Sequence, residues 1–365
     1  MSRSSNLRFN QSDTIILFTV CLVIISSGCS CDIVPSADDT VIITDMAGRE
    51  VAIPEHPGRV AGIGAGALRM LVYAGAADMI AGVEDIERNE RSRPYAIAHR
   101  EFENFPSIGP SHGGDPELIA AARPDVIFWT YTTSGQADDL QEKTGIPVVV
   151  LNYGNLHEQM TAFKEGLQLI GQIINTDTRC DSVIQFIELT IEDLHNRTTM
   201  ISERPAVYIG GVSSQGAHGI TSTRPQYEPF LFINTPNVAS SIGMEHAFID
   251  KEQLIEWNPD IIFIDEGGYP QIIRELQEES ALFSSLKAVR SGELYTVMPY
   301  NSYTTNFGTV LANAYYIGAV LYPDSFSDII PEDKADEIYD ALVGRKIYWD
   351  MKSLYGGFFK VVFQK

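Results

Sequence analysis

The stretch DPELIAAARPDVIFW at 115–129 has a second copy in the chain, DKEQLIEWNPDIIFI at 250–264. Each copy opens with Asp, has Glu two places later, and reaches a Pro-Asp pair before an apolar run. An acidic opener is typical of a helix start, where unpaired N–H groups and the helix dipole favour negative charge. The Pro-Asp pair is typical of a helix end, and the apolar run of a buried strand. We therefore expect one helix-strand unit to be built twice, once in each of two lobes.

Strands alternate with helices on both sides of these copies. From Val41, the sequence VIITDMAGREVAI predicts an entry hairpin with Ala47 and Gly48 at its turn. Apolar strand segments follow at 59–63, 79–83, 125–131 and 147–153, and then within PAVYIGG, DIIFID and ELYTVM after residue 204. Such alternation predicts parallel sheets covered by helices. The expected fold class is α/β, with two α/β lobes of mainly parallel sheets at 41–155 and 201–365.

The segment 156–200 lies between these lobes and has the period of a helix. Apolar residues recur at spacings of three and four from Met160 onward, and again from Ile184 after the polar sequence NTDT. The last 22 residues, 178–199, would form a rod of roughly 33 Å. We therefore expect one long α-helix that joins the two lobes stiffly.

Length and charge limit the classes of function. The chain has 365 residues, 44% of them hydrophobic, which is enough for roughly two domains with substantial cores. Its formal net charge is -22, so its long-range field repels nucleic acids and anionic membrane surfaces. A cationic or metal-bearing ligand, or a basic protein partner, is compatible with this charge. The charge is equally compatible with a role in solubility alone.

The N-terminus indicates export. Arg3 and Arg8 precede an apolar run at 14–25, which is shorter than the about 20 residues that a membrane-spanning helix needs. The small residues SSG then precede Cys29, in a pattern that resembles a lipobox, where the Cys is lipidated and becomes the mature N-terminus. Cys31 is the alternative lipidation site. An ordinary secretory signal is the alternative to a lipobox.

These features predict a signal peptide at 1–28 and a polar tether at 29–40. The lipidated Cys would anchor the exported protein to the outer face of the cytoplasmic membrane, in the periplasm or at the cell surface. Cys180 is the one cysteine beyond residue 31, so an internal disulfide framework is excluded there. We interpret Cys180 as a small buried hydrophobic residue.

Signatures of enzymes are weak in this chain. It has no G-x-S-x-G, H-E-x-x-H or P-loop motif, and its seven histidines are scattered singly. The sequence GIGAGA at 62–67, with Glu84 and Asp85 about 20 residues later, matches a dinucleotide-binding motif. An exported NAD-dependent oxidoreductase is therefore an alternative. Nicotinamide cofactors are scarce outside the cytoplasm, there is no twin-arginine signal, and a hairpin precedes the strand, so a tight strand-to-helix turn is favoured. We expect no enzyme, no catalytic residue and no resident cofactor or metal.

Six segments carry a resemblance to a known family, and they are TDMAGREVAIPEHPGRVAGIG, IAGVED, FPSIGPSHGGDPELIAAARPDVIFW, the connecting helix, FIDKEQLIEWNPDIIFID and AVRSGELYTVMPYNSYTTNFG. Through them, nearly everything after Val41 resembles the substrate-binding proteins of ABC importers for cobalamin, ferric siderophores and haem. The resemblance implies a lipid-anchored or free protein that captures a large metal chelate in a cleft between two lobes. It also implies delivery of that ligand to a membrane permease dimer, without chemistry on the ligand.

The resemblance further implies that loops facing the cleft bind the ligand. Thr130 and His246 stand where cobalamin binders tend to have Trp, which weakens a cobalamin assignment because a flat macrocycle stacks on broad aromatic faces. Tyr and His can complete an iron coordination sphere, so an iron complex is favoured and cobalamin or haem is the alternative. A binder of bare Zn or Mn is a further alternative, and it would need several histidines to converge. The ligand-binding positions implied are Gly66, Ile86, His112, Thr130, Tyr131, His218, His246, Tyr300 and Tyr303.

The repeated Glu suggests a second role. In proteins that this chain resembles, the Glu at this position of each lobe pairs with arginines of the permease, which implies that Glu117 and Glu252 dock there. A two-fold symmetric permease needs the same charge from both lobes, whereas helix capping needs no such match. Two capped helices are the alternative, with each acid worth about 0.3 to 1 kcal/mol.

Overall fold

The computed structural model describes residues 40–362 except 90, 91, 215, 244 and 245. The predicted signal peptide and Cys29 lie outside these residues. Residues Asp39–Lys365 make up one compact unit. Among the helices that the structure describes, none is both long enough and apolar enough to cross a bilayer.

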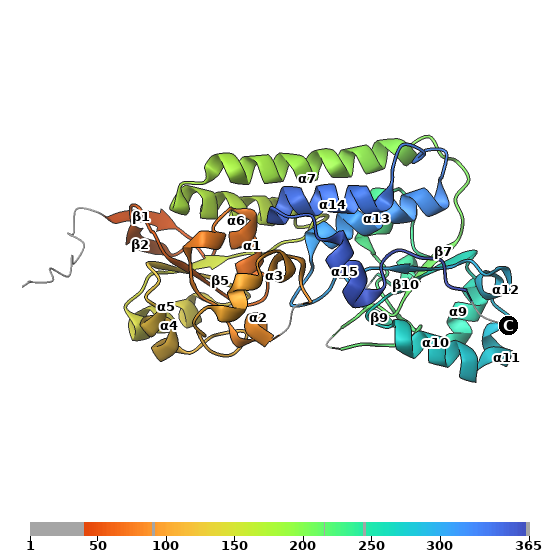
Figure 1. Cartoon of the computed structure of the whole chain (residues 1–365), viewed down its shortest axis with the longest axis horizontal. Coiled ribbons are helices and arrows are strands. Elements are labelled where there is room, and N and C mark those ends of the chain that lie inside the picture. The colour runs from red at the N-terminus through yellow and green to blue at the C-terminus, as the bar shows by residue number, and fades with distance from the viewer. Residues whose placement is uncertain (1–39, 90–91, 215, 244–245, 363–365) are drawn as a thin grey trace, which may run out of the picture. The chain divides into compact units, whose positions relative to one another are not determined.

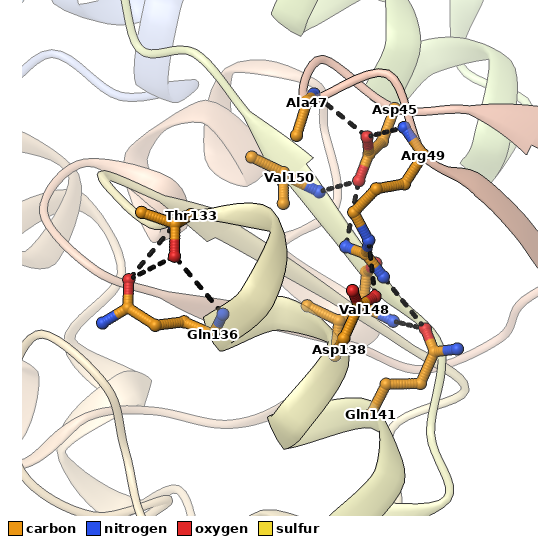
Figure 2. Close-up of polar contacts among 9 residues, drawn as sticks. All are labelled: Asp45, Ala47, Arg49, Thr133, Gln136, Asp138, Gln141, Val148 and Val150. Carbon is orange, nitrogen blue, oxygen red and sulfur yellow. Dashed lines mark hydrogen bonds and ion pairs between the residues drawn. The ribbon is translucent and has the colours of Figure 1, made fainter.

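The chain enters the fold through the expected hairpin, β1 (Thr40–Thr44) with β2 (Glu50–Pro54). Figure 2 shows how the turn of this hairpin is fixed to the N-terminal sheet. Asp45 is buried and accepts hydrogen bonds from the backbone N–H groups of Ala47 and Val150. Arg49 donates to Asp45 at 3.1 Å and to the carbonyl oxygen of Val148 at 3.1 Å. The buried carboxylate is thus paired, as a charge removed from water must be.

The N-terminal lobe has a four-stranded parallel sheet in the order β4-β3-β5-β6. Its strands lie within one or two residues of the predicted segments, because buried strands of parallel sheets are continuous apolar runs. The strands are β3 (Val60–Ile63), β4 (Ile80–Gly82), β5 (Val126–Thr130) and β6 (Val148–Leu151). The helical segments are α1 (Ala67–Tyr73), η1 (Ala77–Met79), α2 (Asp85–Asn89), α3 (Pro94–Ala98), η2 (Arg100–Asn104), α4 (Pro116–Ala122) and α5 (Ser134–Thr144).

The C-terminal lobe has a three-stranded parallel sheet in the order β11-β10-β7, and a short antiparallel pair beside it. Two α/β lobes with mainly parallel sheets are thereby confirmed. The strands are β7 (Val207–Gly210), β8 (Ser222–Thr223), β9 (Ala247–Phe248), β10 (Ile261–Asp265) and β11 (Leu294–Val297). The helical segments are α8 (Glu228–Phe232), η3 (Ser240–Ile242), α9 (Lys251–Trp257), α10 (Tyr269–Glu278), α11 (Ser280–Phe283) and α12 (Lys287–Ser291).

The repeated sequence has the same structural role in both lobes. One copy forms α4 and β5, and the other forms α9 and β10. The Asp of each Pro-Asp pair binds the backbone just before the neighbouring strand: Asp125 accepts from the N–H of Arg59 at 2.8 Å, and Asp260 accepts from the N–H of Ala206 at 2.8 Å. Each Asp therefore aligns the start of two adjacent parallel strands, which explains why the pair recurs.

The segment between the lobes holds two helices, α6 (Met160–Ile174) and α7 (Asp177–Thr198), which lie side by side (Figure 1). Asn175 separates them in the left-handed conformation, with φ of 59°. The 22-residue α7 matches the long helix expected at 178–199, shifted by one residue, whereas the segment 156–200 as a whole holds two helices and not one, because the left-handed Asn175 ends α6. The boundaries 41–155, 156–200 and 201–365 stay predictions.

Helices from the end of the chain pack against the N-terminal lobe. They are α13 (Phe307–Leu321), α14 (Pro331–Val343) and α15 (Tyr348–Tyr355), and α14 contacts both α1 and α3. One hydrophobic cluster accordingly includes Leu71 of α1, Val207 of β7 and Leu342 of α14. The two lobes therefore share a core, which resists large changes in their relative position. Cys180 is fully buried in this cluster, as interpreted.

Candidate functional site

The carboxyl ends of the parallel strands carry the loops from which open α/β sheets usually bind ligands. In the N-terminal lobe, Glu84 follows β4, Tyr131 follows β5 and Tyr153 follows β6. The loop 301–305, which follows β11 of the C-terminal lobe, reaches all three of these residues. We call it the bridging loop. It brings the carboxyl-end edges of the two sheets together.

Arg69 of α1 fixes the bridging loop from the N-terminal lobe. Its side chain is 1% exposed, in a helix whose other residues are all uncharged. The guanidinium donates to the hydroxyl of Tyr153 and, at 2.8 to 3.3 Å, to three carbonyl oxygens of the bridging loop, those of Ser302, Tyr303 and Thr305. A rigid guanidinium with five N–H groups suits this task better than a Lys ammonium.

Tyr303 is the second connection between the lobes. Its hydroxyl donates to Glu84 at 2.7 Å and accepts from the backbone N–H of His112 at 3.0 Å. Burial raises the pKa of Glu84 to about 7, although hydrogen bonds from Tyr303 and Gly64 act in the opposite direction. Burial and the nearby carboxyl of Glu84 raise the pKa of Tyr303. A titratable pair is thus held where the two sheet edges meet.

Backbone strain concentrates at the same place. Thr304 has φ of 66° and Tyr303 has φ of 50°, on the bridging loop, while His112 and Tyr131 on the N-terminal lobe have φ of 70° and 54°. These side chains contact one another, since the Tyr131 and Thr304 hydroxyls are 3.0 Å apart and the His112 and Tyr303 ring centroids are 5.0 Å apart. A non-Gly residue in this conformation costs about 1–3 kcal/mol, and such residues cluster at binding sites.

The glycine-rich turn at 62–67 is covered by protein groups. The N–H of Gly64 donates to both carboxylate oxygens of Glu84 at 3.2 Å. Gly66 has φ of 86°, and a Cβ there would meet the ring of Tyr153 and the methyl group of Thr304. The turn therefore allows the helix, the strand and the bridging loop to pack closely. This agrees with the tight strand-to-helix turn that was favoured over a dinucleotide site. Gly66 belongs to this contact between the lobes.

A second group of the predicted residues lies on the C-terminal lobe. The rings of His218 and His246 have centroids 6.3 Å apart, and each packs edge-on against Phe248 at 4.8 Å. Burial and the neighbouring His218 lower the pKa of His246. Asn301 of the bridging loop donates to the carbonyl oxygen of Ser213, three residues after β7, and so connects this group to the first.

Two predicted ligand contacts are fully buried, Thr130 and Tyr300. The Thr130 hydroxyl donates to the carbonyl oxygen of Ala65 at 2.9 Å, and the Tyr300 ring packs edge-on against Tyr227. Contact of either side chain with a ligand would require its neighbours to move. By contrast, Tyr131 is 65% exposed and His112 is exposed. Ile86 is half-buried on α2, two residues after Glu84.

Both predicted docking residues are exposed at position two of their helices, Glu117 on α4 and Glu252 on α9. Glu117 lines an open pocket of about 470 Å³ together with Lys143 and the first residues of α4. The helix starts differ in one respect. Asp115 accepts from the N–H groups of Glu117 and Leu118, whereas Asp250 holds the same position without a side-chain capping bond.

Several residues of the site were missed from the sequence. Arg69 gave a signal, since it is the single charge in the apolar sequence ALRMLVY. Phe248 gave none, because an aromatic residue before a helix start is ordinary. Glu84 was noted as part of a dinucleotide motif and in the structure binds Tyr303. Contacts between lobes depend on tertiary structure, so their partners were not predictable from spacing.

Comparisons with known proteins agree with this fold. Residues 60–300, about two thirds of the chain, match the model of a family described as periplasmic binding protein. The molybdate-binding protein MolA of Haemophilus influenzae is 23% identical over 324 residues, covering 82% of this chain and 89% of that protein. The structure of molybdate-bound MolA superposes with a TM-score of 0.66 at 19% identity, covering 84% of this chain and 98% of that one. A periplasmic solute-binding protein of Veillonella parvula gives a TM-score of 0.70 at 18% identity, covering 87% and 96%. At these identities the structural similarity shows the fold.

Proposed function

This chain belongs to the periplasmic binding protein family, and from that premise we propose that it is an extracytoplasmic solute-binding lipoprotein of an ABC importer. It captures a metal chelate, a ferric siderophore or a similar iron complex, and delivers it to the permease. The observation that carries this proposal is the meeting of two sheet edges at strained, partly exposed loops. Binding without chemistry needs such a site and no nucleophile or general base.

The side chains at these loops favour a metal-bearing ligand. Tyr131, His112, His218 and His246 offer oxygen and nitrogen donors, which suit iron, and the acidic chain attracts cationic groups. Haem and cobalamin are the alternatives within the same mechanism. The similarity to MolA favours a second candidate, an oxyanion such as molybdate, although the charge of -22 counts against it.

A panel of candidate ligands tests the proposal by thermal shift. Ferric siderophores, haem, cobalamin and molybdate are added in turn, and a ligand at 100 times its Kd stabilises the folded protein by about 2.7 kcal/mol. We expect the largest shift from a ferric siderophore, with no turnover of the ligand. A shift with NAD, or with Zn or Mn reversed by a chelator, would overturn the proposal in favour of an oxidoreductase or a bare-metal binder. A shift with molybdate alone would favour the second candidate.

We also propose that Glu117 and Glu252 dock the two lobes on the permease. Both carboxylates are exposed, and Glu117 lines an open pocket into which a side chain of the partner can reach. Matched charges on two lobes suit a two-fold symmetric partner.

Charge reversal at both positions, Glu117→Arg with Glu252→Arg, is expected to abolish uptake and permease binding while ligand affinity stays unchanged. Reversal at two other exposed carboxylates, Glu165→Arg with Glu278→Arg, gives the same change in net charge and controls for it. Equal uptake by the docking variant and the control variant would contradict the docking role.

The lipid anchor is the remaining part of the proposal. Lipidation at Cys29 predicts that Cys29→Ser releases the protein from the membrane fraction of cells, while Cys31→Ser leaves it there. If only Cys31→Ser releases the protein, the lipidated residue is Cys31. If the wild-type protein is itself absent from the membrane fraction, the N-terminus is an ordinary secretory signal.

A further inference from the structure

The bridging loop is hydrogen-bonded to both lobes at segments that lead into the two helices proposed to meet the permease. We call α4 and α9 the docking helices, because they carry Glu117 and Glu252. Tyr303 of the loop contacts the segment before α4, and Asn301 contacts a segment that leads to α9. One loop is thus connected to both docking helices.

On the N-terminal lobe, the connection passes through the turn 108–115. The hydroxyl of Tyr303 accepts a hydrogen bond of 3.0 Å from the backbone N–H of His112 in this turn. The ends of the turn are joined, because the N–H of Asp115 donates to the carbonyl oxygen at the other end, at 2.8 Å. Asp115 also caps α4, since its side chain accepts from two N–H groups of the first helical turn. A displacement at His112 therefore reaches the start of α4 within three residues.

On the C-terminal lobe, the connection passes through the antiparallel pair of β8 and β9. Asn301 donates to the carbonyl oxygen of Ser213 at 2.8 Å, and the carbonyl oxygen of the residue before Ser213 accepts from the hydroxyl of Ser222 at 2.6 Å. Ser222 of β8 pairs with Phe248 of β9, and Asp250 at the start of α9 follows two residues later. Hydrogen bonds and short lengths of chain therefore join the bridging loop to α9 as well.

The bridging loop is held in a strained conformation. Tyr303 and Thr304 both have positive φ, and non-Gly residues keep such a conformation only while the surrounding contacts hold it. The guanidinium of Arg69 supplies three of these contacts through carbonyl oxygens of the loop. A segment of this kind can change its arrangement when one contact changes, which is what coupling between two sites requires.

We propose that the bridging loop positions both docking helices, with Tyr303 acting on α4 and Asn301 acting on α9. The inference rests on the proposed function, because it gives the loop control over how Glu117 and Glu252 meet the permease. A ligand that displaces the loop changes the position of both carboxylates. Binding between the lobes is thereby transmitted to the docking surface.

Hydrogen exchange of the full-length protein, measured by mass spectrometry, tests the inference without a ligand or a permease. Tyr303→Phe keeps the ring and removes the hydroxyl, so it should raise exchange in the first turn of α4 by roughly twofold to tenfold, the effect of one lost hydrogen bond on a local equilibrium. Asn301→Ala should raise exchange by a similar factor in β9 and in the first turn of α9. Arg69→Met removes contacts of the loop itself, so it should raise exchange at both docking helices.

Tyr295→Phe is the matched control. It also removes a hydroxyl that donates to a carboxylate, that of Glu293 at 2.7 Å, and it should leave exchange at both docking helices unchanged. The first turn of α14 is the internal reference in every variant, and thermal melts show that each variant is folded.

The inference would be overturned by unchanged exchange at α4 in Tyr303→Phe, at α9 in Asn301→Ala, or at both in Arg69→Met. An increase that α14 shares equally would overturn it too, because general destabilisation would then explain the result. Failure of the proposed docking role would appear differently, as uptake that charge reversal at Glu117 and Glu252 leaves unchanged while the exchange pattern is as expected.

Discussion

Replacing Arg69 by Met is expected to destabilise the protein by about 2–4 kcal/mol, because the bridging loop loses three hydrogen bonds from a buried donor. The guanidinium is 1% exposed and donates to three carbonyl oxygens of that loop. The carbonyl oxygens of Ser302 and Thr305 keep Asn306 and Tyr153 as donors, so among the described residues only that of Tyr303 is left without one, at a cost of about 1–3 kcal/mol. The two other lost bonds add about 0.5–1.5 kcal/mol each, and entry of water at the loop reduces the sum. Met has a similar length and no charge, so the cavity left behind is small.

The measurement is urea unfolding of the wild type and of Arg69→Met, with Arg345→Met as control. Arg345 is exposed beyond the end of α14, so its replacement should change the free energy of unfolding by less than about 0.5 kcal/mol. Arg69→Lys should recover only part of the loss, because an ammonium cannot reach all three carbonyl oxygens with the same geometry. A loss below about 1 kcal/mol in Arg69→Met would refute the reasoning that this side chain fixes the loop.

Three further predictions concern protonation, packing and movement. Burial raises the pKa of Asp265 to about 7 and that of Glu266 to about 8, so the folded protein keeps protons that the unfolded chain loses. The free energy of unfolding should therefore fall from pH 5 to pH 8. In urea titrations, the double variant Asp265→Asn with Glu266→Gln should show a weaker dependence of this free energy on pH, and an unchanged dependence would contradict the prediction. Gly66→Ala should lower the melting temperature, because the added methyl group meets Tyr153 and Thr304 and the backbone φ of 86° is strained for Ala. An unchanged melting temperature would show that the turn does not pack closely against these two residues. X-ray scattering should show only a small change in the angle between the lobes on ligand binding, because they share a core; closure by tens of degrees would contradict this.

The sequence predicted the fold well because the pattern of each segment agreed with the α/β arrangement of the whole chain. Apolar runs marked the strands of both sheets, and the repeated Pro-Asp pair marked their starts. The break between α6 and α7 at Asn175 was visible only as a polar sequence, so the predicted segment 156–200 was drawn as one helix. Propensity alone does not determine whether such a break turns the chain back.

The site was less predictable because it depends on contacts between distant segments. Thr130 and Tyr300, which were predicted as ligand contacts, are buried in the structure, and the contacts of Arg69 and Phe248 were not predicted. Thr130 is the last residue of β5, where its hydroxyl turns to the carbonyl oxygen of Ala65, and Tyr300 lies in irregular backbone after β11. Sequence spacing does not report which neighbours cover a side chain at such strand ends.

The position of the bound ligand tests the central claim most directly. Crystals are grown with the iron chelate that gives the largest thermal shift, and anomalous scattering is measured at the iron absorption edge. The proposal predicts one iron site between the sheet edges of the two lobes, with His112 and Tyr131 on one side and His218 and His246 on the other. Iron bound elsewhere, such as in the open groove that Leu156 and Ile191 line beside α7, would contradict it, as would crystals without iron.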